Sequence, residues 1–456
     1  MFRLFDTARG RVVPLEPRDP GKVSIYACGP TVYGPPHIGH GRTNISYDVL
    51  RRYLAWSGYD VTFVSNITDI EDKIIARAEA EGRDWRDITE KCEAVWYQGI
   101  GALGVGRPDH DPHATAYVDD MLDLIGRLVD GGFAYETSDG VYMEVDKVPG
   151  YGELAGQPLE SLRAGARVEA AEEKRSPIDF VLWKKAKPGE PTWDSPWGPG
   201  RPGWHTECVV MSLDLLGEGF DIHCGGLDLR FPHHENERAQ AVADGREFAR
   251  LWFHCGMVEV EGTKMSKSLG NVANVLDLVE RYDPRAYRLL SLQSHYRSPV
   301  EVTDETLVQA EAGLDRLDTF ARKVATDLPS VAAGEVPSDP ATIERFRSVM
   351  DDDLHTQEAM ALVFDLVREA NTALAAGETE AAAPKAAAVL EIAGALGLEL
   401  HGEEAEVPAE LVELARQREA ARADRDWSRA DALRDQIKAA GYVVEDTPAG
   451  PVVRPA

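Results

Sequence analysis

The sequence has few cysteines and no long apolar run. Its five cysteines are scattered through 456 residues, and an odd, dispersed set argues against a disulfide framework. No uninterrupted apolar stretch approaches the roughly 20 residues that a transmembrane helix requires. The opening segment, Met1–Asp6, also lacks the pattern of a signal peptide. These absences predict a cytoplasmic protein without a membrane-embedded part.

Positive charge is scarce as well. The chain has 49 Lys and Arg residues against 78 Asp and Glu residues, which gives a formal net charge of −29. Because affinity for phosphates comes mainly from Lys and Arg, this balance counts against a nucleic-acid partner, although the distribution of charge matters more than the total. Residues 411–440 are close to neutral. On charge alone they favour a solvated helix with ion pairs between residues four apart.

The length and the 43% hydrophobic content predict two to four compact units. In the first unit, residues 23–28 and 61–65 have the pattern of strands, and residues 38–57 show a helical apolar face. Strand, loop, helix and strand in this order make the βαβ unit of a parallel, Rossmann-like sheet. Ligands bind at the carboxyl ends of such strands, which is where Cys28 and Asn66 fall.

A second half of this sheet is expected after an insertion rich in Gly, Pro and Trp, at about 147–204. The other expected elements are a helix over 116–131, a helix over 207–216, a strand over 220–223, a helix near 236–243 and a strand near 256–260. The predicted fold class is α/β. It comprises a Rossmann-like parallel-sheet domain over 1–270 with the insertion, an α-helical bundle over 271–401 and a small C-terminal α+β unit over 402–456.

Two short motifs carry nucleotide chemistry. The first, Pro36–His40, lies where a loop enters the first helix. Gly39 there lets a nucleotide approach the backbone, and the helix N-terminus offers N–H groups to phosphate. His37 and His40 can donate hydrogen bonds to oxygens that gain charge as the α-phosphorus is attacked. Taken alone, the motif is equally compatible with two helix-capping histidines.

The second motif, Lys264–Ser268, follows a predicted strand and lies in a polar setting. Lys264 and Lys267 are point charges that can close over a departing pyrophosphate. A solvated basic loop would have the same composition. Both motifs in one chain, in this order and on the expected elements, predict an ATP-dependent enzyme that makes an acyl-adenylate.

A candidate metal site combines residues from distant segments. On a helix, His233 and Glu237 are four residues apart and project from one face, where they can share a metal ion. Cys28 ends the first strand, and Cys208 lies near the start of the helix that follows the insertion. Two thiolates, one imidazole and one carboxylate make a reasonable Zn²⁺ set.

The spacing of these residues is not that of a zinc finger, and alternatives stay open. Each cysteine taken alone fits a small buried residue, which is the only interpretation for Cys92 and Cys255. Cys224 and His234 are rivals for the ligand positions. His234 points about 100° around the helix from its neighbour, where it would face the substrate or bond Arg238.

The two nucleotide motifs together resemble the signature of class I aminoacyl-tRNA synthetases. With Cys28, the segments Gly203–Cys208, His223–Leu229 and Phe231–Glu237 resemble the cysteinyl-tRNA synthetase family, and the resemblance runs along essentially the whole chain. It implies activation of L-cysteine with ATP and Mg²⁺, and transfer of cysteine to the 3′ end of tRNA(Cys). It assigns catalysis to His37, His40, Lys264 and Lys267, ATP binding to these residues and Gly39, and one Zn²⁺ per chain to Cys28, Cys208, His233 and Glu237.

The resemblance also implies that the substrate thiol joins the metal as a thiolate. A metal separates cysteine from serine far better than size does, so no editing domain is needed, and the insertion looks too short for one. Trp204 and His223 are further substrate-binding candidates, although packing would also explain them. Residues 402–456 resemble an anticodon-binding end, and the protein is expected to be a monomer. The candidate RNA contacts there are Arg422, Arg425, Trp427 and Arg429.

Three other functions share part of this pattern. A ligase that joins cysteine to an amino sugar, as in mycothiol synthesis, would share both nucleotide motifs and the zinc set, but it gives no reason for the unit after residue 402. A non-catalytic paralogue that binds zinc and RNA would be expected to lose a histidine or lysine of the motifs, and none is missing. A small-substrate nucleotidyltransferase explains the first motif alone.

Overall fold

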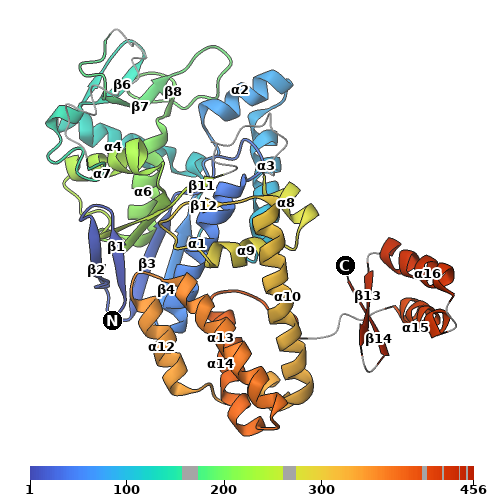
Figure 1. The fold of residues 1–456 in the computed structure, drawn as a ribbon. Helices are drawn as coiled ribbons and strands as arrows, with labels where there is room; N and C mark the ends of the chain where they lie inside the picture. The colour runs from blue at the N-terminus through green and yellow to red at the C-terminus, as the bar shows by residue number, and fades with distance from the viewer. Residues whose placement is uncertain are drawn as a thin grey trace. The chain divides into compact units, whose positions relative to one another are not determined.

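The computed structural model describes residues 1–156, 173–259, 274–402, 408–423, 426–440, 442–447 and 450–455. The chain divides into two compact units, and its helices and strands are labelled in Figure 1. The first unit contains Met1–Leu314, Asp339–Leu366 and Glu391–Glu399, and the second contains Asp315–Ser338, Val367–Leu390 and Leu400–Ala456. No helix among the described residues is long and apolar enough to cross a membrane.

A four-stranded parallel sheet forms the centre of the first unit. Its strands are β3 (Lys22–Ala27), β4 (Asp60–Ser65), β9 (Ile222–Gly226) and β10 (Leu251–Cys255), in the spatial order β10-β9-β3-β4. Helix α1 (Ile38–Trp56) connects β3 to β4, so these three elements make the expected βαβ unit. The fold class predicted from the sequence is therefore confirmed.

Two strands of this sheet differ from their predicted positions. The strand expected over 220–223 is β9, which begins at Ile222. The prediction that a strand of this sheet lies near 256–260 is wrong. The sheet instead uses β10, whose five residues are all buried. A strand buried on both faces shows a continuous apolar run without alternation, and this hid β10 from a periodicity analysis. The segment near 258 forms only the short strand β11 (Val258–Glu259), which pairs in parallel with β12 (Val300–Glu301).

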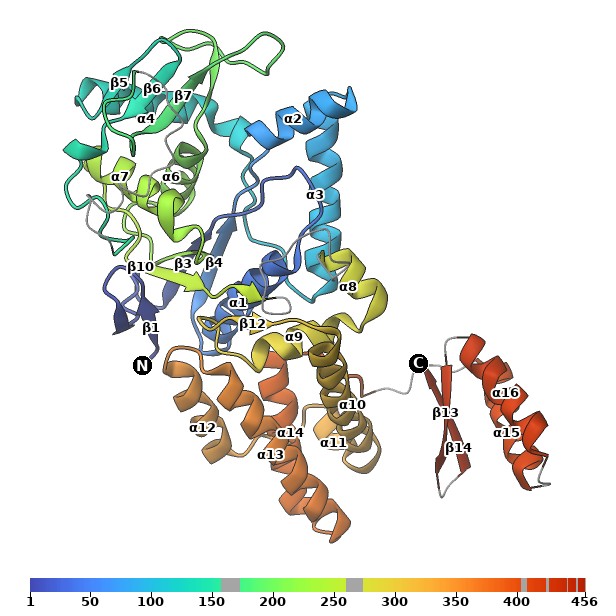
Figure 2. The ribbon, with the colours of Figure 1, turned by 45° about the horizontal axis from the view of Figure 1, so that its top comes forward.

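The inserted region carries its own antiparallel sheet, near the top of Figures 1 and 2. Its strands are β5 (Ala134–Glu136), β6 (Gly140–Met143), β7 (Phe180–Lys185) and β8 (Gly200–Pro202). The sheet thus begins before residue 147, and residues 157–172 lie outside the described part. The helices between β4 and this sheet are α2 (Asp72–Glu81), α3 (Trp85–Ala102) and α4 (Val118–Asp130).

Helices dominate the rest of the chain. The helices of the second half of the Rossmann-like domain are α6 (Trp204–Leu216) and α7 (Glu235–Ala243). Those that follow are α8 (Val275–Arg281), α9 (Pro284–Leu292), α10 (Asp304–Asp327), α11 (Pro329–Ala332), α12 (Pro340–Asp351), α13 (Thr356–Ala375) and α14 (Thr379–Ala395). A short hairpin, β1 (Arg3–Asp6) and β2 (Arg11–Pro14), precedes the parallel sheet.

The C-terminal segment contains helices α15 (Ala409–Ala423) and α16 (Trp427–Ala439) and an antiparallel hairpin. The hairpin strands are β13 (Tyr442–Thr447) and β14 (Gly450–Pro455). Leu411, Ala415 and Ile437 from the helices pack with Val453 from the hairpin in a small apolar core. Two helices and a hairpin make the small α+β unit expected from the sequence.

Candidate functional site

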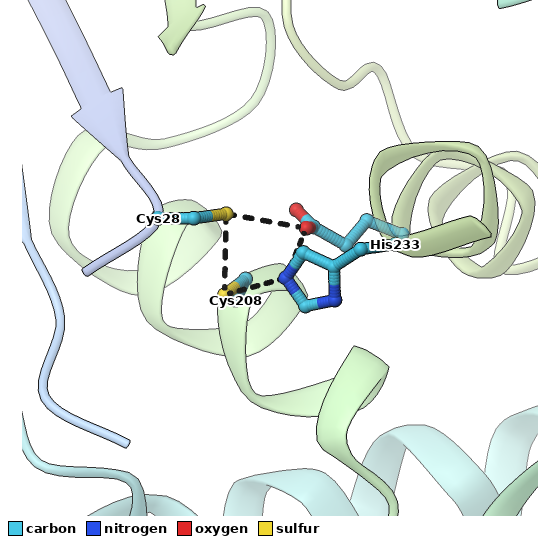
Figure 3. A group of neighbouring side chains, drawn as sticks. Cys28, Cys208 and His233 are labelled. Atoms are coloured by element: carbon cyan, nitrogen blue, oxygen red, sulfur yellow. Dashed lines mark hydrogen bonds and ion pairs between the residues drawn. The ribbon is translucent and has the colours of Figure 1, made fainter. Parts of the chain in front are cut away.

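Four side chains with metal-binding donors meet at the carboxyl end of β3. Cys28 directly follows β3, Cys208 lies on α6, and His233 lies in the short π-helix Arg230–His234 before α7 (Figure 3). Glu237 lies on α7. The sulfur atoms of Cys28 and Cys208 are 3.7 Å apart, and Cys28 Sγ is 3.4 Å from Glu237 Oε1. His233 Nε2 lies 3.6 Å from Cys208 Sγ and 2.9 Å from Glu237 Oε1. Segments far apart in sequence thus converge on one point, which we call the donor cluster.

The donor cluster fits a tetrahedral metal ion. With Zn–S bonds of about 2.3 Å, two sulfur ligands of a tetrahedral Zn²⁺ lie roughly 3.8 Å apart, which matches the separation between Cys28 and Cys208. All four ligand atoms lie within 4.8 Å of one another. Two thiolates with one imidazole and one carboxylate are a donor set that suits Zn²⁺ and is unsuited to Mg²⁺ or Ca²⁺.

The electrostatics of the cluster are set by burial and by mutual contacts. Burial opposes the ionisation of Glu237, but His223 and His233 outweigh it and hold the pKa of this carboxyl well below its usual value. Burial also opposes the ionisation of Cys208, yet contacts with Cys28 and His233 lower the pKa of this thiol to about 6. Burial raises the pKa of Cys28 well above its usual value. Metal ligands must be deprotonated, so at neutral pH Cys208 and Glu237 are prepared for a cation.

Further histidines surround the cluster. His223 Nε2 lies 2.7 Å from Glu237 Oε2. His234 Nε2 lies 3.3 Å from Cys28 Sγ, and its Nδ1 lies 2.9 Å from His254 Nε2. Cys28, His223, His234 and Glu237 form a second group with metal-binding geometry. His234 thus remains a rival ligand, and it does not bond Arg238, which instead pairs with Glu153 and Glu235.

The other candidate ligand, Cys224, lies outside both groups of donors found among the described residues. It is fully buried on β9, and burial raises the pKa of its thiol well above the usual value. Cys92 and Cys255 are also buried, at 5% and 0% exposure, as expected for small apolar residues.

The first nucleotide motif forms the start of α1. His37 is the N-cap residue, and its Nδ1 accepts a hydrogen bond from the backbone N–H of His40. The two imidazole rings stack with centroids 3.4 Å apart. Burial lowers the pKa of both histidines, so they are neutral at pH 7. A side chain at Gly39 would come within 2.9 Å of His37 Nδ1, which explains the glycine between them.

The donor cluster and this motif share one cavity of about 290 Å³. Cys28, Cys208 and His233 line one part of it, and His37 and His40 line another. An ATP α-phosphate and a metal-held amino acid can therefore occupy one space. Lys264 and Lys267 of the second motif lie outside the described residues.

The two substrate-binding candidates occupy different positions. Trp204 lines the cavity, is 37% exposed and stacks on His233 with centroids 4.0 Å apart. His223 is fully buried behind Glu237 and does not line the cavity. Trp204 is therefore accessible from the cavity, whereas His223 contacts Glu237 from behind the cluster.

A buried polar network next to the cluster was missed in the sequence. Asn66 Oδ1 accepts a hydrogen bond from the backbone N–H of Gly29 at 2.8 Å, and Asn66 Nδ2 donates to Thr68 Oγ1 at 3.2 Å. Thr68 in turn donates to the buried carboxyl of Glu207, which precedes Cys208. Only the position of Asn66 and Thr68 after a strand signalled them, because their partners are distant in sequence.

Comparison with known proteins agrees with this geometry. Three family models match successive parts of the chain: "tRNA synthetases class I (C) catalytic domain" at residues 14–312, "DALR domain" at 345–401, and "Cysteinyl-tRNA ligase anticodon binding domain" at 404–454. A cysteine–tRNA ligase from Halorhodospira halophila is 46% identical over 99% of this chain and 98% of its own length. One from Pseudomonas fluorescens is 45% identical with the same coverage.

The chain belongs to the cysteine–tRNA ligase family. It is thus an aminoacyl-tRNA synthetase of class I, and the resemblance inferred from the motifs is confirmed. Solved structures outside the cysteine–tRNA ligase family share the fold. Methionyl-tRNA synthetase from Mycobacterium tuberculosis, in complex with methionyl-adenylate, has a TM-score of 0.61 at 16% identity, over 82% of this chain and 89% of its own. A leucyl-tRNA synthetase of Agrobacterium radiobacter has a TM-score of 0.63 at 11% identity, over 84% and 85%.

Proposed function

We propose that this cysteine–tRNA ligase activates L-cysteine with Mg²⁺ and ATP and transfers it from cysteinyl-adenylate to the 3′ end of tRNA(Cys). One observation carries the proposal: the donor cluster and the His37–His40 motif line the same cavity. A cysteine bound through its thiol at the cluster would have its carboxylate within the space that the motif offers to the α-phosphate. Holding both reactants in one orientation supplies much of the rate enhancement of such a transfer.

Cys28, Cys208, His233 and Glu237 would hold one Zn²⁺ per chain. When bound, the metal supplies a site that prefers a thiolate to a neutral hydroxyl, and this separates cysteine from serine. His223 bonds Glu237 and orients it, as second ligand layers do at metal sites. Trp204 covers His233 and limits access of water to the amino acid.

The nucleotide is assigned to the start of α1. The free N–H groups there and Gly39 would receive phosphate oxygens, and the neutral rings of His37 and His40 would donate hydrogen bonds as charge develops. Lys264 and Lys267 would neutralise the departing pyrophosphate.

Three domains would divide the work: a catalytic domain over 1–270, a helical region over 271–401 and a tRNA anticodon-binding unit over 402–456. The last unit exposes Trp427 to 59%, which suits stacking on a base. Arg422 and Arg429 would meet phosphates, and so would Arg425, which lies outside the described residues. We further propose that the enzyme acts as a monomer in the cytoplasm.

A cysteine ligase that acts on an amino sugar is not favoured. A family model accounts for residues 404–454 as an anticodon-binding domain, and the relative from Halorhodospira halophila matches 99% of this chain. A ligase for a small acceptor gives no role to that unit. If deletion of residues 403–456 left tRNA affinity and charging kinetics unchanged, the RNA-binding role of the unit would be wrong.

The central test is ATP–pyrophosphate exchange without tRNA. Exchange should depend on cysteine, and it should be lost on chelation or in Cys208→Ala, because the cluster loses its metal. Cys92→Ala is the matched control, since this cysteine is equally buried but lies outside the donor groups. Equal exchange with serine would contradict selection through a metal, and exchange independent of both amino acids would contradict the proposed function.

A further inference from the structure

Tyr33 and Lys73 form an exposed pair on the wall of the cavity. Tyr33 lies in the loop between β3 and α1, and Lys73 is the second residue of α2. The Lys73 ammonium lies 5.3 Å from the centre of the Tyr33 ring, within the range of a cation–π interaction. Both residues line the cavity that also contains the donor cluster and the His37–His40 motif. Tyr33 is nevertheless 41% exposed, which is unusual for a large aromatic residue.

Backbone contacts fix the loop that carries Tyr33. The preceding residue, Val32, is 1% exposed, and its N–H donates to the carbonyl of Thr68 at 3.1 Å. The N–H of Tyr33 donates to the carbonyl of Thr31 at 2.9 Å, and Arg77 donates to the carbonyl of Tyr33. The ring is thus presented by a fixed loop. When a ligand stacks on the ring, the loop therefore loses little conformational entropy.

The Lys73 ammonium has no carboxylate partner among the residues that the structure describes. In the described part of the chain, no Asp or Glu oxygen lies within ion-pair distance of its ammonium, whereas Lys184 and Arg201 are paired with Asp72. Arg77 is likewise paired, with Glu81. In a chain of net charge −29, an unpaired cation on the wall of the active cavity indicates an anionic ligand.

We propose that Tyr33 and Lys73 form the subsite for the 3′-terminal nucleotide of the acceptor RNA. The inference rests on the proposed function, because charging requires the terminal ribose to enter this cavity. A base stacks on the exposed part of Tyr33, and a backbone phosphate lies at Lys73. Proteins bind single-stranded RNA ends by this combination of aromatic stacking and a nearby cation. The donor cluster and the His37–His40 motif account for the amino acid and ATP, which leaves this wall for the third substrate, the acceptor RNA.

The first test separates the two half-reactions. Tyr33→Ala should lower kcat/KM for tRNA charging by about 5- to 100-fold, the range expected for loss of one stacked base. Cysteine-dependent ATP–pyrophosphate exchange should change by less than about twofold, which also shows that the variant is folded. Tyr33→Phe should charge tRNA normally, and Lys73→Ala should weaken the dependence of charging on salt. The matched control is Tyr282→Ala, since Tyr282 carries Arg281 at 5.2 Å from its ring but does not line the cavity.

The second test removes the ligand group instead of the ring. For the wild-type enzyme, tRNA that lacks its 3′-terminal nucleotide should bind about 5- to 100-fold more weakly than complete tRNA. In Tyr33→Ala the difference between the two tRNAs should be several-fold smaller, because only the contact at Lys73 remains. An unchanged ratio in Tyr33→Ala, or a parallel loss of exchange and charging, would overturn the subsite. A wild-type enzyme that exchanges pyrophosphate with cysteine but charges no tRNA would instead refute the proposed function.

Discussion

The Nε2 atom of His223 lies 2.7 Å from Oε2 of Glu237, while the second oxygen of this carboxylate faces His233 at 2.9 Å. Glu237 is fully buried, so its two oxygens have fixed partners. The bond to His223 therefore sets the direction in which Oε1 points toward the donor cluster. Such contacts behind a ligand tune metal affinity without touching the metal.

From this relationship we predict that His223→Ala lowers Zn²⁺ affinity by about 10- to 100-fold. The KM for cysteine should rise with it, because fewer enzyme molecules carry the metal at a given zinc concentration. Competition with a chromogenic chelator measures the affinity. Cys224→Ala is the control, since Cys224 is the next residue on β9, is equally buried and lies outside the donor groups. Unchanged affinity in His223→Ala would show that Glu237 is oriented by its other contacts.

The network around Asn66 gives a second prediction. Asn66→Ala removes the acceptor for the N–H of Gly29 and the donor to Thr68, so buried polar groups lose their partners. We expect the free energy of unfolding of this unit to fall by about 1–3 kcal/mol. We also expect kcat/KM for cysteine to fall more than that for ATP, because Gly29 adjoins Cys28. Denaturation and exchange kinetics measure the two effects. The control, Thr68→Ser, keeps the hydroxyl and should be close to wild type. Equal losses of kcat/KM for cysteine and for ATP in Asn66→Ala would contradict a local role.

The sequence allowed some features to be predicted because they are local. The β3–α1–β4 unit follows from strand and helix periodicity within about 45 residues, and the N-cap position of His37 follows from the end of a loop. In contrast, β10 shows no alternation because it is buried on both faces. Periodicity therefore failed where the sheet is most enclosed.

The donor cluster shows the same limit in the site. Only His233 and Glu237 are close in sequence, and Cys28 and Cys208 join them through the parallel pairing of β3 with β9 and the packing of α6 on β3. Spacing alone could not choose between the candidate ligands, and family resemblance was needed. The position of Asn66 and Thr68 after a strand was their only local signal, since their roles depend on the distant residues Gly29 and Glu207.

A third prediction concerns the buried ion pair between Asp48 and Arg288. Arg288 is 1% exposed, and Asp48 on α1 is its carboxylate partner. Asp48→Ala would leave a buried guanidinium uncompensated and should cost about 3–5 kcal/mol. The double variant Asp48→Ala/Arg288→Met should recover most of this loss, because no buried charge remains. Chemical denaturation provides the measurement. The control is Asp87, which forms an exposed ion pair with Arg83. Asp87→Ala should change the free energy of unfolding by less than about 1 kcal/mol.

The last prediction is a pH dependence of stability from His254. Burial lowers the pKa of this histidine to about 3 in the folded protein, whereas a histidine in the unfolded chain has a pKa of about 6.5. Between these values the unfolded state binds the additional proton, so stability falls as the pH decreases below about 6.5. The loss from His254 should be about 1 kcal/mol between pH 7.5 and pH 5.5.

His254→Gln should remove that part of the pH dependence. The amide can replace the hydrogen bonds of His254 to Thr7 and His234, at 2.8 and 2.9 Å, without titrating. Thermal unfolding at pH 7.5 and 5.5 therefore compares the two proteins, and only the difference between their two shifts is attributed to His254. The variant should lose less stability on acidification than the wild type. Equal shifts would mean that His254 becomes protonated in the folded protein as readily as in the unfolded chain, because a neighbouring group stabilises its positive charge.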